Sequence, residues 1–332
     1  MIDVSAIDPS IQVMEVRLTD SDDLILQWSD NHIGEIPLDF LRLYCYEQPN
    51  STPELSTYFS KASFMGLVLF LAWLKYINTA GVCILKNVPT EDQTVTKVAE
   101  LISPVQKSIY GTSFDVVSTP NPINVAYSSA HLDFHMDLIY YESAPGLQLL
   151  HCMRFDSCVE GGESLLLDIF HVAENFRRSY PVEFHTLSRV PATFQKIHYE
   201  RESPVHMIYQ KPHIMLNHRH EIVSINWAPA FEGPLSVDPE DVELYYEAYH
   251  KFAAAIQNSP AIIELKMKPG DLMIFNNRRI LHGRKEFNLN GGVRHLQGCY
   301  VNIDEFKSKV YVLSNQLGDK EPIKRVGNQC WF

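Results

Sequence analysis

The chain has 332 residues, of which 45% are hydrophobic and 20% charged, and its formal net charge is -12 at pH 7. This length fits one large or two small domains, and the composition is that of a globular protein rather than a disordered one. The acidic balance and the lack of any basic run in the sequence argue against nucleic acid as a partner.

The first predicted elements are short strands near the N-terminus. Residues 10–50 alternate strand-like pieces, Val13 to Leu18 and Leu24 to Trp28, with a polar turn at residues 29–32. We therefore expect a small N-terminal β region over residues 1–60. The N-terminus has acidic residues and no basic segment, so we predict neither a signal peptide nor a mitochondrial presequence and expect a cytoplasmic protein.

The longest apolar run, residues 64–74, predicts a core helix. It has 11 residues, whereas a membrane-spanning helix needs about 20, so no membrane association is expected. The helix should continue to Asn78 and end near Gly81, before a strand at Val82 to Leu85. Six cysteines lie scattered without CxxC spacing, which indicates reduced thiols rather than a disulfide framework.

From about residue 80 onwards, strand-like runs alternate with Gly/Pro turns. Two helices are expected, at Val172 to Arg178 and at Pro239 to Ile256, where apolar residues recur at helical spacing. Leu272 to Phe275 is a short buried-strand run that follows a turn. Helices in this arrangement would brace one face of a jelly roll.

His135-Met-Asp137 and the distant His282 are the candidate metal ligands. Two imidazoles and one carboxylate form the facial ligand set of a non-haem Fe(II) site, which leaves positions open for a chelating co-substrate and O2. A second copy of the triplet, His131-Leu-Asp133, lies directly before the first. Structural histidines are the alternative interpretation, so the spacing alone does not decide.

Arg294 lies twelve residues beyond His282, ahead of an apolar and aromatic stretch. The planar guanidinium group binds carboxylates in a bidentate manner. Arg294 is therefore predicted to anchor the far carboxylate of 2-oxoglutarate, and the alternative is a salt bridge at a strand edge.

Six ordered blocks resemble a known family: Asn124 to Tyr127, Phe134 to Asp137, Pro145 to Cys152, Gly161 to Ser164, Leu281 to Arg284 and Arg294 to Leu296. Together they look like the γ-butyrobetaine dioxygenase and trimethyllysine dioxygenase family, Fe(II)- and 2-oxoglutarate-dependent hydroxylases of carnitine biosynthesis. The match runs from about residue 80 to about residue 315, with a weaker echo at residues 24–45. The family motif Phe-His-x-Asp selects His135 and Asp137.

The resemblance implies a mainly β fold with flanking helices, in which residues 61–332 form a double-stranded β-helix (jelly roll) core. It also implies Fe(II), 2-oxoglutarate and O2 as cofactor and co-substrates, ascorbate as the reductant, and a homodimer. In relatives the N-terminal β domain often binds zinc through clustered cysteines and a histidine. His32 lies at the histidine position, but the cysteine cluster has no counterpart here, so the region is predicted to lack zinc.

The resemblance also places a substrate site. In the family an aromatic cage holds a trimethylammonium group by cation-π attraction, and the matching positions are Tyr110, Phe114, Tyr127 and Tyr300. Phe114 stands where a Trp is common, which would weaken binding without abolishing it. Asn124 is predicted to make a polar contact in the same pocket. Core packing is the alternative role for the aromatic residues, and a turn at a strand end is the alternative for Asn124.

Two departures from the family pattern concern the substrate. Ala228 stands where relatives have an asparagine that binds the substrate's polar end, and Arg278 stands where a Trp is common. Loss of an amide donor to a buried carboxylate costs on the order of 1–3 kcal/mol. Both departures argue against γ-butyrobetaine itself as the substrate.

The sequence thus predicts a dioxygenase that hydroxylates an aliphatic C–H bond of a small quaternary ammonium compound similar to γ-butyrobetaine or trimethyllysine. Two alternatives stay open. The same cofactors could act on another amine, a phosphonate analogue or a natural-product intermediate, by hydroxylation or desaturation. Alternatively, the chain could be a jelly-roll binding protein without catalytic activity, although the complete ligand triad together with Arg294 argues against that.

Overall fold

The computed structural model describes residues 13–18, 24–28, 33–36, 64–118 and 128–317. The chain divides into two compact units, Met1–Glu54 and Leu55–Phe332. The domain boundary predicted near residue 60 lies outside the described residues and stays a prediction.

The first unit contains a three-stranded antiparallel sheet in the order β1-β2-β3. Its strands are β1 (Val13–Leu18), β2 (Leu24–Trp28) and β3 (Ile33–Ile36). The two strands predicted from the sequence are confirmed with the same bounds. The predicted turn at residues 29–32, which contains His32, lies outside the described residues.

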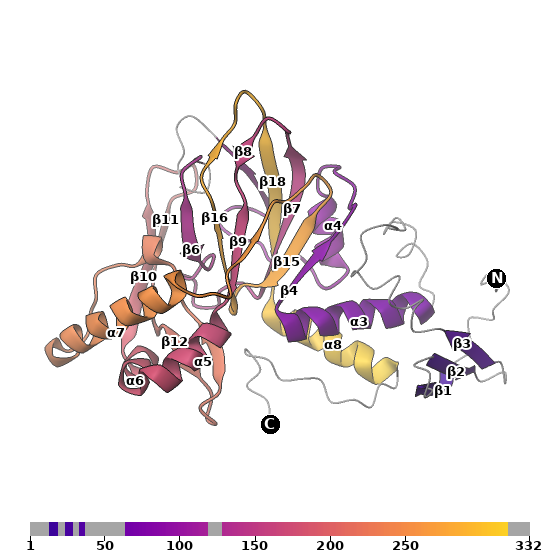
Figure 1. Cartoon of the computed structure of the whole chain (residues 1–332), viewed down its shortest axis with the longest axis horizontal. Coiled ribbons are helices and arrows are strands. Elements are labelled where there is room, and N and C mark those ends of the chain that lie inside the picture. The colour runs from indigo at the N-terminus through magenta and orange to yellow at the C-terminus, as the bar shows by residue number, and fades with distance from the viewer. Residues whose placement is uncertain (1–12, 19–23, 29–32, 37–63, 119–127, 318–332) are drawn as a thin grey trace. The chain divides into compact units, whose positions relative to one another are not determined.

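The second unit is built on two antiparallel sheets (Figure 1). The five-stranded sheet has the order β4 (Val82–Leu85), β15 (Leu272–Asn276), β7 (Leu147–Phe155), β18 (Arg294–Val301) and β5 (Ser113–Val117). The four-stranded sheet has the order β14 (Ile263–Leu265), β9 (Ser164–Asp168), β16 (Ile280–Arg284) and β6 (Leu132–His135). Together they form the predicted double-stranded β-helix core.

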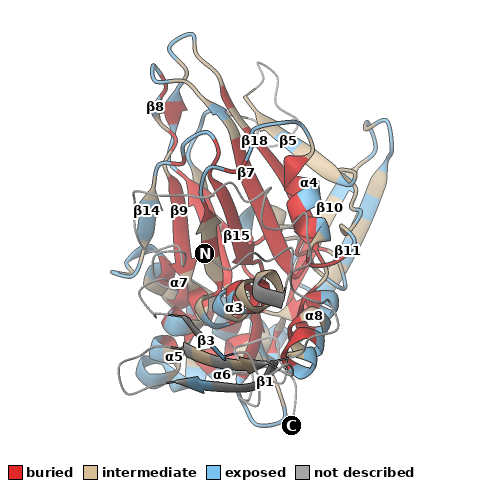
Figure 2. Cartoon of the chain, turned by 90° about the vertical axis from the view of Figure 1, so that its right-hand side faces the viewer, coloured by how far each residue is buried: buried red, intermediate tan, exposed pale blue. Residues whose placement is uncertain are grey.

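The five-stranded sheet buries both of its faces, which follows from the alternation of side chains along a strand. On β15, Leu272 and Ile274 face a cluster that includes residues of α3 (Phe64–Ala80) and α8 (Ile303–Gln316). Met273 and Phe275 face a second cluster, shared with the four-stranded sheet. Figure 2 shows the buried residues following these strands. The continuous apolar run that predicted β15 is therefore the pattern of a strand covered on both sides.

Helices pack against the sheets. The predicted helix at residues 64–78 is confirmed as α3, and the backbone N–H of Gly81 donates to the Ile77 carbonyl oxygen where the helix ends. The left-handed φ of 81° at Gly81 suits glycine. The other two predicted helices are α5 (Ile169–Ser179) and α7 (Pro239–Gln257).

The prediction of only two helices after residue 80 was wrong. The structure adds α4 (Thr94–Glu100), α6 (Pro181–Arg189) and α8. Tyr180 alone separates α5 from α6, with a proline in the first turn of α6, so a single helical periodicity does not run through both. α4 has only 7 residues, too few to establish a periodic pattern.

Three smaller pairs of strands complete the unit. They are β10 (Pro191–His198) with β11 (Val205–Pro212), β12 (Ile214–Leu216) with β13 (Ile222–Ile225), and β8 (Glu160–Gly161) with β17 (Phe287–Asn288). A short 3-10 helix, η3 (Pro229–Phe231), follows β13.

Candidate active site

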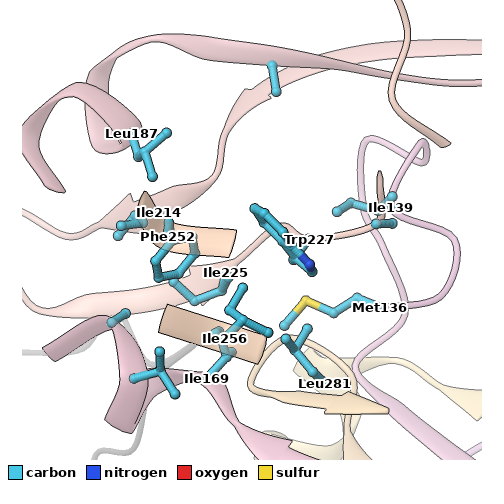
Figure 3. Close-up of a cluster of buried hydrophobic side chains, with 14 of the residues drawn as sticks. Met136, Ile139, Ile169, Leu187, Ile214, Ile225, Trp227, Phe252, Ile256 and Leu281 are labelled. Atoms are coloured by element: carbon cyan, nitrogen blue, oxygen red, sulfur yellow. The ribbon is translucent and has the colours of Figure 1, made fainter. Parts of the chain in front are cut away.

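The residues next to the predicted metal ligands are core residues. Met136 is 2% exposed and Leu281 is fully buried, and both belong to an apolar cluster with Trp227 (Figure 3). Because successive side chains of an extended chain point to opposite sides, Met136 and Leu281 turn the neighbouring ligands away from this cluster. His135 and His282 thereby face the space next to Asp137.

The two histidines are brought together by strand pairing. His135 on β6 and His282 on β16 are direct antiparallel partners, and their ring centroids are 4.2 Å apart. Gly283 permits this close approach, because a Cβ at that position would lie 2.7 Å from the backbone oxygen of Leu132. The glycine of the His282-Gly283-Arg284 block is thus needed for the geometry of the site.

Asp137 completes a group that fits a metal ion. Its Oδ1 lies 3.4 Å from Nε2 of His135 and 4.0 Å from Nε2 of His282. One ligand atom from each of the three residues lies within 4.8 Å of the others, and this is the one such metal-binding group within the described residues. The predicted ligands His135, Asp137 and His282 are therefore close enough together to hold one cation.

The protonation states also suit a metal. Nδ1 of His135 donates to the Asp133 carbonyl oxygen at 2.8 Å, so Nε2 is the nitrogen left for a metal. Burial opposes the charged form of His135, but Asp137 raises its pKa above the ordinary value, and a bound cation would take the place of the proton on Nε2. Burial lowers the pKa of His282 to about 3, so this imidazole is neutral, as metal binding requires. Burial opposes ionisation of Asp137, but His135, His282 and Tyr300 together hold its pKa below the ordinary value.

Asn277 is a structural part of the site that the sequence analysis did not identify. The backbone N–H of Asp137 donates to Oδ1 of Asn277, and Nδ2 of Asn277 donates to the Asp137 carbonyl oxygen, both at 2.9 Å. Asn277 is 1% exposed. Leu138, which follows Asp137 in the chain, has a φ of 55°. This left-handed conformation is rare for leucine, and the two hydrogen bonds to Asn277 help to maintain it.

Tyr300, predicted as a cage residue, has a second contact. Its hydroxyl donates to Oδ2 of Asp137 at 2.8 Å, the oxygen not directed at the histidines. Its ring stacks on Phe114, with centroids 5.1 Å apart. Tyr300 thus joins the carboxylate of the metal group to the aromatic wall beside it.

A pocket opens next to the three ligands, and three of the predicted substrate residues line it. Tyr110, Phe114 and Tyr300 lie on its wall, with the Tyr110 and Phe114 centroids 6.2 Å apart. Phe114 has room because its partner on β18 is Gly298, where a Cβ would lie 2.5 Å from the Phe114 ring. The other lining residues are Val116, His131, Leu132, Asp133, Phe134, His135, Asp137, Leu138, Tyr140, Pro229, Ala230 and Phe231.

Two predicted substrate residues, Asn124 and Tyr127, lie outside the described residues. Sequence reasoning missed Tyr140 and Phe231, whose rings are 5.3 Å apart on the pocket wall. An aromatic residue three positions after Asp137 was a visible signal for Tyr140. No local pattern pointed to Phe231, which η3 brings to the pocket.

Arg294 lies at the start of β18 and is 4% exposed. Its guanidinium carbon is 5.6 Å from the Phe155 ring centroid and 5.4 Å from that of Phe287. Among the described residues Nε has no hydrogen-bond partner and the side chain forms no salt bridge. Burial lowers its pKa to about 10, so it stays a cation that lacks a counter-anion in the described part of the protein. Such a site suits an anionic ligand.

The two departures from the family pattern are both placed by the structure. Ala228 is fully buried, directly before η3. The Arg278 guanidinium donates to the Ala144 carbonyl oxygen at 2.6 Å, and Arg278 is not among the residues that line the pocket. Arg278 therefore fixes the segment after the metal motif and does not form part of the aromatic wall.

Known proteins share both the sequence pattern and the fold. The chain is 32% identical to γ-butyrobetaine dioxygenase of Pseudomonas sp. (strain AK-1), over 93% of this chain and 83% of the relative. It is 28% identical to mitochondrial trimethyllysine dioxygenase of Bos taurus, over 95% of this chain and 77% of that relative. The solved structure of an asparagine oxygenase matches with a TM-score of 0.51 and 18% identity, over 71% of this chain and 80% of its own. That of the non-haem iron oxygenase OrfP matches with a TM-score of 0.54 and 14% identity, over 75% of this chain and 89% of its own. At these identities, the two structures support the fold alone.

A family model describes most of the second unit. It is the model of the taurine catabolism dioxygenase TauD, TfdA family, and it matches residues 67–300, which include His135, Asp137, His282 and Arg294. The resemblance, the fold and the enzyme class predicted from the sequence are confirmed. The chain belongs to the TauD, TfdA family of dioxygenases.

Proposed function

We propose that the protein is an Fe(II)- and 2-oxoglutarate-dependent dioxygenase that hydroxylates an aliphatic C–H bond of a small quaternary ammonium compound. The observation that supports this most is the pairing of His135 with His282 next to Asp137, directly beside an aromatic pocket. A facial triad with open coordination positions is the ligand set of this enzyme class.

The residues present fit the metal and the co-substrate. His135, Asp137 and His282 would hold Fe(II), which with 2-oxoglutarate supplies the oxidising chemistry that converts C–H to C–OH with O2. Arg294, a buried cation without a counter-anion among the described residues, would pair with the far carboxylate of 2-oxoglutarate. Tyr300 fixes Asp137 through its hydroxyl, and its ring lines the pocket where the substrate would bind. The contribution of the protein is orientation, because a displaced C–H bond is not attacked.

The aromatic pocket wall supports a cationic substrate. The Phe114 ring lies 6.2 Å from that of Tyr110 and 5.1 Å from that of Tyr300, and the negative faces of such rings attract ammonium groups. Tyr127 and Asn124 are proposed to complete the site. The relatives named γ-butyrobetaine and trimethyllysine dioxygenase support this class of substrate.

The buried Ala228 favours a second candidate with the same cofactors. Ala228 offers no amide to the polar end of a substrate. Its presence therefore favours a compound other than γ-butyrobetaine, such as a phosphonate analogue. Hydroxylation and desaturation use the same metal site, and the product distinguishes them.

The test is 2-oxoglutarate turnover to succinate with Fe(II), ascorbate and O2 against γ-butyrobetaine, trimethyllysine and a panel of quaternary ammonium acids and phosphonates. We expect one of them to stimulate succinate formation, and His135→Ala to abolish both the stimulation and iron binding. His185→Ala, on the exposed surface of α6, is the matched control and should behave as wild type. Failure of the wild type to bind iron would refute the proposal.

Phe114→Leu tests the aromatic wall separately. It keeps an apolar side chain but removes the ring, and should raise the KM for the quaternary ammonium substrate by about fivefold or more. Binding of 5,5-dimethylhexanoate, in which an uncharged tert-butyl group replaces the trimethylammonium group of γ-butyrobetaine, should change little. Equal losses for both compounds would mean that Phe114 contributes packing and not cation recognition.

Location and assembly stay proposals. Among the described residues, no helix has both the length and the apolar character needed to cross a membrane. We propose a cytoplasmic homodimer, as the family resemblance implied. Cell fractionation and light scattering of the purified protein would test the two statements.

A further inference from the structure

Two cationic side chains lie against the rings of the substrate pocket. Nζ of Lys196, on β10, is 5.4 Å from the ring centroid of Phe231. The guanidinium carbon of Arg201, just beyond β10, is 5.2 Å from the ring centroid of Tyr110. Phe231 and Tyr110 both line the pocket. The two cations therefore lie immediately beside its walls, and both side chains are half-buried.

In the described part of the chain, no carboxylate forms an ion pair with either cation. Nη2 of Arg201 donates to the Ile109 carbonyl oxygen, which holds it over Tyr110. Burial, and then repulsion by Arg201, lower the pKa of Lys196. The carboxyl group of Glu232, next to Phe231 in sequence, instead accepts from the Tyr249 hydroxyl at 3.2 Å.

Placing two like charges together costs free energy unless an anion joins them. In a chain whose net charge is -12, acidic partners are plentiful, so the arrangement is not imposed by composition. A ligand anion at this position would remove the repulsion and gain charge-assisted hydrogen bonds from both side chains.

Tyr140 gives an independent indication of a polar ligand group at the same wall. It is 2% exposed and lines the pocket, and its hydroxyl has no well-formed hydrogen bond among the described residues. Burial, and then the nearby Tyr110, raise its pKa, so the hydroxyl keeps its proton and can donate it. Its ring is 5.3 Å from that of Phe231, the residue that lies under Lys196. A buried hydroxyl without a partner is costly, so a polar group of the substrate would stabilise this side of the pocket.

We propose that Lys196 and Arg201 form a subsite for an anionic group of the substrate, and that Tyr140 donates to the same group. The substrate is then a zwitterion, with its quaternary ammonium against Tyr110, Phe114 and Tyr300 and its carboxylate or phosphonate at the two cations. The proposal rests on the proposed function. The subsite would take the place of the amide group that an asparagine at position 228 would supply.

The experiment compares three ligands with the same trimethylammonium head. They are γ-butyrobetaine, 3-(trimethylammonio)propylphosphonate and butyltrimethylammonium, which has no anionic group. Their Kd values are measured by anaerobic calorimetry on enzyme loaded with Fe(II) and 2-oxoglutarate, so that no turnover occurs. Stronger binding of one of the two zwitterions identifies which anion the subsite prefers.

Lys196→Gln is the main variant, because Arg201 also supports Tyr110. We expect it to raise the Kd of the preferred zwitterion about fivefold and to leave butyltrimethylammonium unchanged, and Lys196→Glu should have a larger effect. Tyr140→Phe should weaken the zwitterion in the same selective way. The controls are Lys97→Gln on α4 and Arg178→Gln on α5, both exposed and neither among the residues that line the pocket.

The outcomes separate the subsite from the function. If wild type binds butyltrimethylammonium as tightly as the zwitterions, or if Lys196→Glu affects all three equally, the subsite is refuted while the dioxygenase stands. If no quaternary ammonium compound binds or stimulates succinate formation, the proposed substrate class fails and the subsite fails with it.

Discussion

At Asp137 the backbone and the side chain are fixed by different residues. Asn277 holds the peptide groups on both sides of the Cα through two hydrogen bonds, and Tyr300 holds one carboxylate oxygen. The other oxygen is left facing His135 and His282. Metal ligands that are oriented in advance bind with less loss of entropy, which is why such supporting groups matter nearly as much as the ligands.

Asn277→Ala should weaken metal binding about tenfold or more, because Asp137 loses both backbone hydrogen bonds and the left-handed Leu138 is no longer supported. The measurement is an anaerobic Fe(II) titration. Asn175→Ala, at an exposed site on α5, should leave the affinity unchanged. Wild-type affinity in the Asn277 variant would show that the loop is held by other contacts.

Tyr300→Phe removes one oxygen and keeps the ring that stacks on Phe114. We expect a metal Kd about tenfold higher or more, since a hydrogen bond to a charged group contributes roughly 1.5–3 kcal/mol. The Kd of the quaternary ammonium ligand, measured at saturating metal, should stay close to wild type. A loss confined to substrate binding would contradict this division between hydroxyl and ring.

The candidate metal ligands could be predicted from the sequence, whereas Asn277 could not. His135, Asp137 and His282 have the residue types of one facial ligand set, and the family resemblance selected this His-x-Asp triplet over His131-Leu-Asp133. Asn277 acts on a residue 140 positions earlier in the chain, and its neighbour Asn276 offers the same side chain. Only the turn between β15 and β16 decides which of the two reaches Asp137, and that is a property of the folded sheets.

At the scale of elements, the contact between β6 and β16 determines the site. Each strand supplies one histidine, and the register shift beside this pair lies between His282 and Arg284, at Gly283. The strands can approach only because Gly283 has no side chain. The separation of the two imidazoles is thus set by one glycine.

Gly283→Ala should push β6 away from β16, because the new methyl group would overlap the Leu132 carbonyl oxygen. We expect weaker Fe(II) binding and a free energy of unfolding lower by about 1–3 kcal/mol. Gly291→Ala is the control: a Cβ there meets nothing within 4 Å, although its φ is 80°. That variant should lose about 1 kcal/mol of stability with unchanged metal affinity.

Elements with a strong local pattern were predictable, and those defined by their neighbours were not. β15 has five buried residues in a row and α3 is a long apolar run. α6 begins directly after α5, and its proline starts a new helix where the preceding one ends. Its position follows from packing against α7 and not from its own sequence.

At the scale of the whole molecule, Glu232 links stability to pH. Burial raises its pKa from 4.5 to about 7 despite the Tyr249 hydrogen bond. Between these values the folded protein keeps a proton that the unfolded chain releases, so the contribution of Glu232 to the free energy of unfolding falls as the pH rises from about 4.5 to 7.

The free energy of unfolding of Glu232→Gln, relative to wild type, should therefore be higher at pH 8 than at pH 5 by roughly 2 kcal/mol after allowance for solvent screening. Urea unfolding of both proteins at the two pH values measures the difference. Glu243→Gln, exposed on α7, should show no such dependence. An equal effect of the substitution at the two pH values would mean that Glu232 is ionised at low cost in the fold.

The pairing of His135 with His282 also has a consequence for biosynthesis. β6 leaves the ribosome well before Asn277 and β16. Until then, the nascent chain offers only His135 and Asp137 of the three candidate ligands. Two ligands on a mobile segment hold iron weakly, and long-range strand pairing is slow to form. Iron capture should thus be one of the last events of maturation, which keeps a redox-active metal away from unfolded polypeptide.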